Sequence, residues 1–252
     1  TLLMDSLKCL NNECINLLHK YRLLERLIKS ELKRSVLSEV KIDQEIENKA
    51  INELKSKFKI TNESELEKFL DGNHLDQKDF NHLALKELRT KKYTSNKFAN
   101  KSESRFLERK NQLDIVIYSL LRLKDFYKAR ELYFRIYEKE ADFGDLATLF
   151  SEGIENTTRG IIGPVPLEQA HPALVDKLRN SKPGEVQPPI QIDGSYVLIR
   201  LESLDTAHLD NFMRSKMLLE LFNKWIDSET NEYNENLLNR SRTTINTSED
   251  EK

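Results

Sequence analysis

The positions of the helix-breaking residues constrain this chain more than any other feature. Six of the seven glycines and all six prolines lie between residues 143 and 201, although the chain has 252 residues. Glycine and proline favour turns, strand ends and close approaches of the backbone, and long helices exclude them. We therefore predict turns and strands in this segment and long helices on both sides of it.

The N-terminal flank shows apolar residues at helical spacing. Those between residues 13 and 40 predict one long amphipathic helix. A second helix is expected to begin after Asp43, which is a candidate N-cap residue. A third is expected to open at Asn62 and to close at Gly72, and a fourth to begin at Gln77.

The C-terminal flank carries another amphipathic stripe, which includes Leu218, Phe222 and Trp225. This stripe is too wide to remain in water, because each large apolar side chain gains roughly 1.5–3 kcal/mol on burial. We expect Phe222 and Trp225 to pack against the helix at residues 13–40. The residues beyond Asn239 are polar, and they predict a disordered tail.

Within the central region, alternation and turn residues predict a sheet. The apolar, β-branched run from Asp114 to Arg122 predicts a first strand, and Asp193-Gly194 predicts a hairpin turn into a last strand. We expect a mostly antiparallel sheet of four strands within about residues 112–203, with its helices on one face.

Charge and hydropathy exclude some function classes. The formal net charge is −2, with 23 Lys and Arg against 18 Asp and Glu in residues 1–110. Neither half is basic enough to indicate nucleic-acid binding, and the basic run at residues 89–101 is more typical of a solvated helix face than of a surface that steers an acidic partner. No apolar run approaches the roughly 20 residues of a membrane span, so we predict none.

Neither a disulfide nor a metal site is predicted. Cys9 and Cys14 are five residues apart on one expected helix, which favours free thiols in a reducing compartment. The five histidines lack metal-ligand spacing, and no nucleotide-binding loop is present, so no metal and no cofactor are expected. The N-terminus shows no secretory signal, and we expect a cytoplasmic location.

Four elements in order resemble a parvulin-type (PpiC, rotamase) peptidyl-prolyl isomerase domain. They are the F-x-x-L-A-x-x-F-S turn at residues 143–151, the strand bracketed by Gly160 and Gly163, the turn at residues 183–186, and the hairpin at Asp193-Gly194. The order of helices in the N-terminal flank is similar to the helical domain of SurA-type chaperones.

The resemblance implies an α+β protein: a mostly helical, chaperone-like module with an inserted parvulin (FKBP-like) unit and a C-terminal helix. The inserted unit would hold the four-stranded antiparallel sheet. The expected boundaries are a helical domain at 1–110, the parvulin-like domain at 111–204, a C-terminal helix packing on the helical domain at 205–238, and the tail at 239–252.

The resemblance also implies the catalytic positions, and here the sequence departs from the family. Two strand positions that carry histidine in parvulins are Tyr118 and Tyr196 in this chain. A third position, often Asp or Cys in the family, corresponds to Gly153 or Ile161, and no carboxylate or thiol is expected to stand in for it.

The substrate-binding positions implied by the resemblance form a shallow, aliphatic pocket. Its apolar residues would be Ile162, Val165, Ala170 and Leu174, with His171 and Arg159 at the edge. Solvent exposure is the alternative for Arg159, and a plain helix-start role is the alternative for His171.

Two principal functions remain open from sequence. One is a parvulin-like peptidyl-prolyl isomerase and chaperone that binds proline-containing or unfolded polypeptide and stabilises the twisted X-Pro amide without covalent chemistry. The other is a catalytically weak or inactive peptide-binding chaperone or scaffold on the same fold. A helical interaction protein with a degenerate insert is a third reading. The sequence leaves the oligomeric state open.

Overall fold

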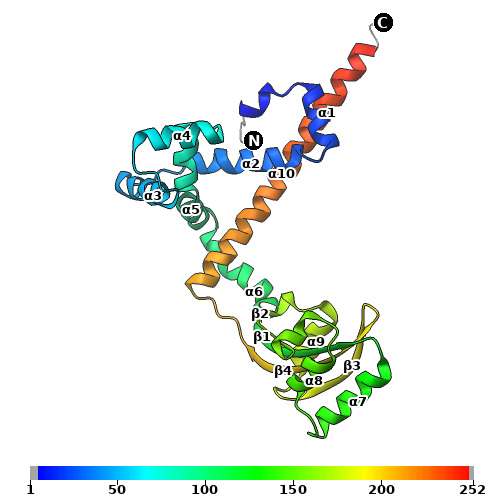
Figure 1. The fold of residues 1–252 in the computed structure, drawn as a ribbon. Coiled ribbons are helices and arrows are strands. Elements are labelled where there is room, and N and C mark those ends of the chain that lie inside the picture. Colours follow the sequence, from blue (N-terminus) through cyan, green and yellow to red (C-terminus); the bar gives the residue numbers. More distant parts are fainter. Residues whose placement is uncertain (1–4, 250–252) are drawn as a thin grey trace. The chain divides into compact units, whose positions relative to one another are not determined.

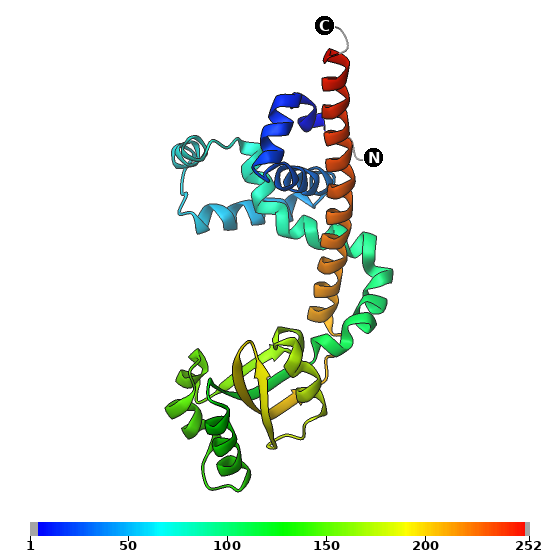
Figure 2. The same cartoon turned by 90° about the vertical axis from the view of Figure 1, so that its right-hand side faces the viewer.

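In the computed structural model of the chain, residues 5–249 are described, and they divide into two compact units (Figures 1 and 2). The helical unit comprises residues 1–103 together with 211–252, and the sheet unit comprises residues 104–210. Each unit is considered separately below.

The helical unit contains only helices among its described residues. They are η1 (Asp5–Cys9), α1 (Asn12–Lys20), α2 (Leu24–Ser38), α3 (Gln44–Lys57), α4 (Glu63–Asn73), α5 (Gln77–Phe98), η2 (Ala99–Lys101) and α10 (Asn211–Glu249). The structure therefore confirms the long helices expected on both sides of the glycine-rich segment.

The single helix expected over residues 13–40 is wrong, because α1 and α2 are separate. Arg22 adopts a left-handed conformation with φ 57°, and the Leu23 N–H donates to the Leu18 carbonyl. Arg22 thus takes the left-handed position that glycine usually occupies at the end of a helix, and this bond closes α1. The end of α4 also differs from the expected end at Gly72. The helix continues to Asn73, and its C-cap residue, His74, is left-handed as well.

The core of the helical unit joins α2 to α10. Phe222 is 2% exposed and shares one apolar cluster with Ile28 and Leu32, as expected from the C-terminal stripe. Trp225 is half-buried against the same cluster, and the Lys97 ammonium lies 3.3 Å from its ring centroid. Residues far apart in sequence thus complete one core. A second, smaller cluster is centred on Ile60, Leu66 and Phe80.

The expected disordered tail is also corrected, because α10 continues to Glu249. The sequence has no glycine or proline after Gly194, so it holds no strong helix breaker in this region. Residues 250–252 lie outside the described part of the chain.

The sheet unit combines helices with one antiparallel sheet in the order β2-β1-β4-β3, which confirms the α+β class. Its elements are α6 (Ser102–Leu113), β1 (Ile115–Leu123), α7 (Phe126–Tyr137), α8 (Phe143–Phe150), η3 (Ile154–Thr158), β2 (Ile161–Pro166), η4 (Leu167–Gln169), α9 (Pro172–Asn180), β3 (Val186–Ile192) and β4 (Ser195–Asp205). The strand expected from Asp114 to Arg122 is β1, and Asp193-Gly194 joins β3 to β4.

Helices cover both faces of this sheet, so the expectation that they cover one face is wrong. Helix α9 packs on the face that carries Tyr118 and Leu120, and α7 and α8 pack on the face that carries Leu121 and Leu123. The cause is the apolar run of β1, whose alternate side chains are buried on both sides.

Two glycines allow β2 to approach β1 closely. Gly160 and Gly163 have φ values of 81° and 112°, and a Cβ would lie 2.8 Å from the Leu120 carbonyl oxygen at the first and 2.5 Å from that of Val116 at the second. Both positions therefore need glycine.

Other sequence expectations concern thiols and membranes. Cys9 and Cys14 are both free and exposed. None of the helices within residues 5–249 is long and apolar enough to cross a membrane.

We predict that Phe222→Ala destabilises the helical unit by about 3–5 kcal/mol, because it opens a cavity in the core that joins α2 to α10. Chemical denaturation measures the change. Phe212→Ala, on the same helix, is the control, because that ring is 76% exposed and its loss should cost under about 0.5 kcal/mol. Equal stabilities of the two variants would contradict the packing.

Candidate functional site

Tyr118 lies at the centre of the sheet, beside two of the expected substrate-binding residues. It pairs with Ile162 across β1 and β2, and Val116 pairs with Val165. Tyr118 is 5% exposed, and burial raises the pKa of its phenol; Arg122 lowers that pKa and the Glu155 carboxylate raises it. The hydroxyl therefore stays protonated through the neutral range and can donate a hydrogen bond.

The other two apolar candidates for substrate binding lie in the core under this face of the sheet. Ala170 and Leu174 are 4% and 2% exposed and belong to the core cluster between α9 and the sheet. Ile162 and Val165 are only half-buried. Ile162 and Val165 are therefore the most exposed of the four, while Ala170 and Leu174 pack the sheet against α9.

Tyr118 and Tyr196, the two positions that the resemblance relates to the family's histidines, lie on opposite faces of the sheet. Tyr196 packs with Leu121 and Leu198 against α7, and its ring centroid is 5.1 Å from that of Phe126. The residues of β4 that share the face of Tyr118 are Val197, Ile199 and Leu201, which are at most 3% exposed and cannot donate a side-chain hydrogen bond.

The two polar candidates are held by local contacts. Arg159 forms ion pairs with Asp142 (2.8 Å) and Asp145 (2.7 Å), which attach the loop before β2 to the start of α8. His171 caps α9, where its Nδ1 accepts from the Ala173 N–H, and its Nε2 lies 3.6 Å from Asp193. The helix-start alternative thus describes His171, and Arg159 is a loop tether.

Glu155 is the site residue that sequence reasoning missed. It lies in η3 and is 5% exposed, and its Oε1 accepts a 2.7 Å hydrogen bond from the Ser151 hydroxyl. The Arg122 guanidinium is 3.8 Å from the same oxygen. A carboxylate buried to this extent needs such partners, since an unpaired one would carry a large desolvation cost.

The Glu155 carboxylate fills the space beside Gly153. A Cβ added at Gly153 would overlap both of its oxygens. The chain therefore places a carboxylate beside Gly153, one of the two positions that the resemblance relates to the family's Asp or Cys. It reaches that place from two residues further along the chain.

Backbone contacts fix this loop to β1. The Arg122 N–H donates to the Ser151 hydroxyl (3.0 Å), and the Glu152 N–H donates to the Arg122 carbonyl (2.9 Å). At the other end of the loop, the Gly160 N–H donates to the Glu155 carbonyl (2.8 Å). The carboxylate is thus held by the same strand that carries Tyr118.

The arrangement offers a neutral phenol donor, a buried carboxylate and an aliphatic strip along β2. Within residues 5–249, no group of three or more His, Cys, Asp or Glu side chains is arranged to hold a metal ion. The site suits binding of an apolar group next to a polar, uncharged one.

We predict that Gly153→Ala destabilises the sheet unit by about 1–3 kcal/mol, because the new methyl group displaces a buried carboxylate from its hydrogen bond. In the Glu155→Ala background the same change should cost less, and the difference measured by denaturation gives the coupling energy. Gly72→Ala is the control, since a Cβ there meets nothing within 4 Å. Purely additive effects would refute the overlap.

Comparisons with known proteins bear on the sheet unit first. Residues 126–203 match the family model of the rotamase domain, described as the PPIC-type PPIASE domain. Among curated proteins, none matches the sequence of this chain.

Solved structures resemble the chain only distantly. The peptidylprolyl isomerase PrsA from Bacillus anthracis shares 17% identity over 87% of this chain and 97% of its own, with a TM-score of 0.46. PrsA from Bacillus cereus shares 18% over 92% of this chain and 88% of its own, also at 0.46. A structure from a pair of SurA-like chaperones of Campylobacter jejuni shares 14% over 92% of this chain and 86% of its own, at 0.38.

The identities and TM-scores of these structures are too low to indicate an activity. The family match therefore depends on residues 126–203. That segment runs from the start of α7 into β4, and it includes Ser151, Gly153, Glu155 and the two glycines of β2. Residues 126–203 of this chain thus match the family model of a rotamase domain of the PPIC type.

Proposed function

We propose that this protein is a peptidyl-prolyl cis-trans isomerase and chaperone of low catalytic power, which binds proline-containing or unfolded polypeptide through the site around Tyr118. The observation that carries the proposal is the position of one donor, Tyr118, which pairs with Ile162 of β2 and senses the charge of the buried Glu155 carboxylate, on the strand that precedes the segment matching the rotamase family.

Isomerisation requires only that the site binds the twisted amide better than the planar one. Amide resonance gives a rotation barrier of about 18–20 kcal/mol, and it places negative charge on the oxygen and takes it from the nitrogen. Twisting removes this polarisation and leaves a lone pair on nitrogen. A donor near that nitrogen and a negative charge near the oxygen therefore both favour the twisted form.

The residues of this site match those two tasks. The Tyr118 hydroxyl can donate to the imide nitrogen, because burial keeps it protonated. The fixed Glu155 carboxylate disfavours the planar amide when the carbonyl oxygen faces it. Ile162 and Val165 offer the proline ring an apolar surface, since both remain partly exposed.

The second candidate function is a peptide-binding chaperone or scaffold without significant catalysis. The observation that favours it is the apolar surface of β4, because the residues that share the face of Tyr118, Val197, Ile199 and Leu201, have no side-chain donor. With a single neutral donor, we expect an isomerisation rate well below that of an enzyme with a polar side chain on both strands.

The cytoplasmic location stays a prediction, and one of the two Campylobacter jejuni chaperones is described as periplasmic. Polypeptide clients are the partners that the family implies.

We predict that Tyr118→Phe and Glu155→Gln each lower the catalysed isomerisation rate of a short X-Pro peptide, Tyr118→Phe by roughly tenfold, since one hydrogen bond is worth about 1–1.5 kcal/mol. A protease-free assay measures the rate. Tyr196→Phe is the matched control and should keep the wild-type rate, because its ring lies on the other face of the sheet.

The pH profile tests the role of the phenol further. The raised pKa of Tyr118 keeps the hydroxyl protonated beyond its ordinary value of 10.0, so activity should not fall between about pH 7 and 9. A loss caused by Tyr196→Phe and not by Tyr118→Phe would place the chemistry elsewhere. Background rates in all proteins would favour the scaffold.

A further prediction concerns unfolded clients. The wild-type protein should slow the aggregation of an unfolded protein, followed by light scattering, and Tyr118→Phe should slow it equally, because holding a client does not need the donor. Albumin at equal mass concentration is the control for crowding. If aggregation proceeds as with albumin, the chaperone part of the proposal is wrong.

A further inference from the structure

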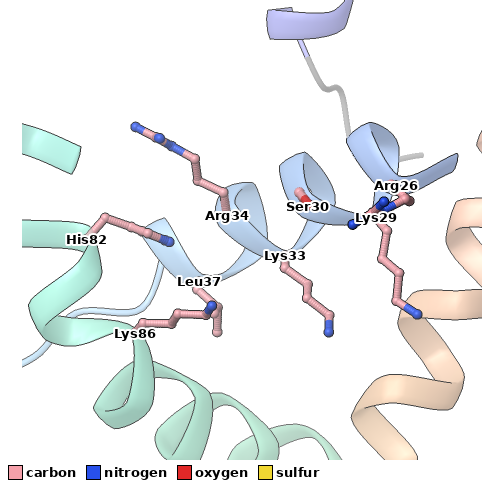
Figure 3. A pocket seen from close by; sticks show the side chains of 8 residues that line it. All are labelled: Arg26, Lys29, Ser30, Lys33, Arg34, Leu37, His82 and Lys86. Carbon is pink, nitrogen blue, oxygen red and sulfur yellow. The ribbon is translucent and has the colours of Figure 1, made fainter. Parts of the chain in front are cut away.

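A basic pocket lies in the helical unit, on α2 and α5. Its cavity is about 340 Å³, and Figure 3 shows the side chains around it. Five cationic side chains and one histidine line it: Arg26, Lys29, Lys33, Arg34, Lys86 and His82. This is a concentration of positive charge that the fold does not need for its core.

Internal partners neutralise only part of this charge. Arg34 pairs with Asp79 at 2.5 Å and leaves α2 on a different side from Lys33 (Figure 3). Lys29 pairs with Asp227 of α10, whereas the Lys33 ammonium donates to a neutral amide, Asn223, at 3.2 Å. These internal bonds leave the group of lysines with more cations than carboxylates.

Burial and neighbouring cations lower the pKa values of two side chains in the pocket, Lys33 and His82. Burial has the largest effect and lowers the pKa of Lys33. The neighbouring charges of Lys29 and Lys86 lower that pKa further, whereas Asp227 raises it. Burial lowers the pKa of His82, and Arg34, Arg89 and Lys86 lower it further, with Asp79 acting in the opposite sense. An anion bound here would relieve this repulsion.

An apolar groove adjoins the pocket. Its cavity is about 640 Å³, it lies along α5 and α10, and Lys86 lines both cavities. Its apolar residues are Leu83, Leu218 and Leu219, of which Leu83 and Leu219 are 44% and 47% exposed. Positive charge and exposed leucines therefore stand side by side on one unit.

We propose that the basic pocket and this groove form one binding surface for polypeptide segments in which acidic side chains stand next to apolar ones. The proposal rests on the proposed chaperone function, and it names the class of segment that the helical unit prefers. The lysines attract the carboxylates, and Leu83 and Leu219 bury the adjacent apolar side chains. The groove is what favours a polypeptide over a phosphate compound, which would gain nothing from leucines.

Fluorescence anisotropy with labelled, proline-free peptides tests the proposal at low salt. The first peptide alternates glutamates with leucine pairs, and the second has glutamine at each glutamate. We expect the first to bind at least about tenfold more tightly, and its affinity to fall as salt rises. Equal affinities would overturn the charge preference.

Variants locate the surface. Lys33→Glu combined with Lys86→Glu should raise the Kd of the acidic peptide roughly tenfold, and the glutamine versions should raise it less. Leu83→Ser with Leu219→Ser should weaken both peptides. Lys57→Glu with Lys68→Glu, at exposed lysines of α3 and α4, is the control and should weaken neither. Thermal melting confirms that each variant remains folded.

Competition separates the remaining outcomes. If tripolyphosphate displaces the peptide and binds unchanged to the leucine variant, the pocket is a phosphate site and the proposal is wrong. If all variants bind like the wild type, the surface is elsewhere and the proposal is also wrong. The isomerisation rate of a short neutral peptide should not change in any of these variants, so a failure here is distinguishable from a failure of the rotamase site.

Discussion

The sheet unit depends on strand β1, which is paired along both edges and buried on both faces. Each buried backbone N–H and C=O group of β1 must find a hydrogen-bond partner on β2 or β4, because an unpaired buried group costs about 1–3 kcal/mol. The loop that carries Glu155 is attached to the same strand through Ser151 and the Arg122 N–H. Tyr118 and Glu155 are therefore positioned by the most constrained element of the unit.

Sequence patterns predicted the elements of this unit well and the faces of its strands poorly. Gly160, Gly163 and the Asp193-Gly194 turn identified β2 and the last hairpin, because their conformations require particular residues. The resemblance implied Tyr118 and Tyr196 as the catalytic positions, but a position counted from Gly194 fixes the face of a strand only to within one residue. A shift of one residue moves every side chain of a strand to the other side, and Val197, the residue after Tyr196, is the one that shares the face of Tyr118.

Other features could not be read from periodicity. Glu155 lies in a short 3-10 turn, and its carboxylate enters the site only because Gly153 leaves the space. The break between α1 and α2 occurs at Arg22, a residue that gives no local signal for a left-handed conformation. Neither the turn nor the break follows from spacing, whereas the amphipathic stripes do predict helices in the regions of α2, α5 and α10.

The helical unit shows why charge counts along a sequence do not locate a binding surface. The basic run at residues 89–101 is largely used inside the unit: Arg89 pairs with Glu47, Lys92 donates to the Lys41 carbonyl, and Lys97 lies over Trp225. Lys29, Lys33 and Lys86 are dispersed in the sequence, yet the fold brings them to one pocket where few carboxylates oppose them. A surface that attracts acidic segments is thus made by packing α2 against α5, and neither helix would form it alone.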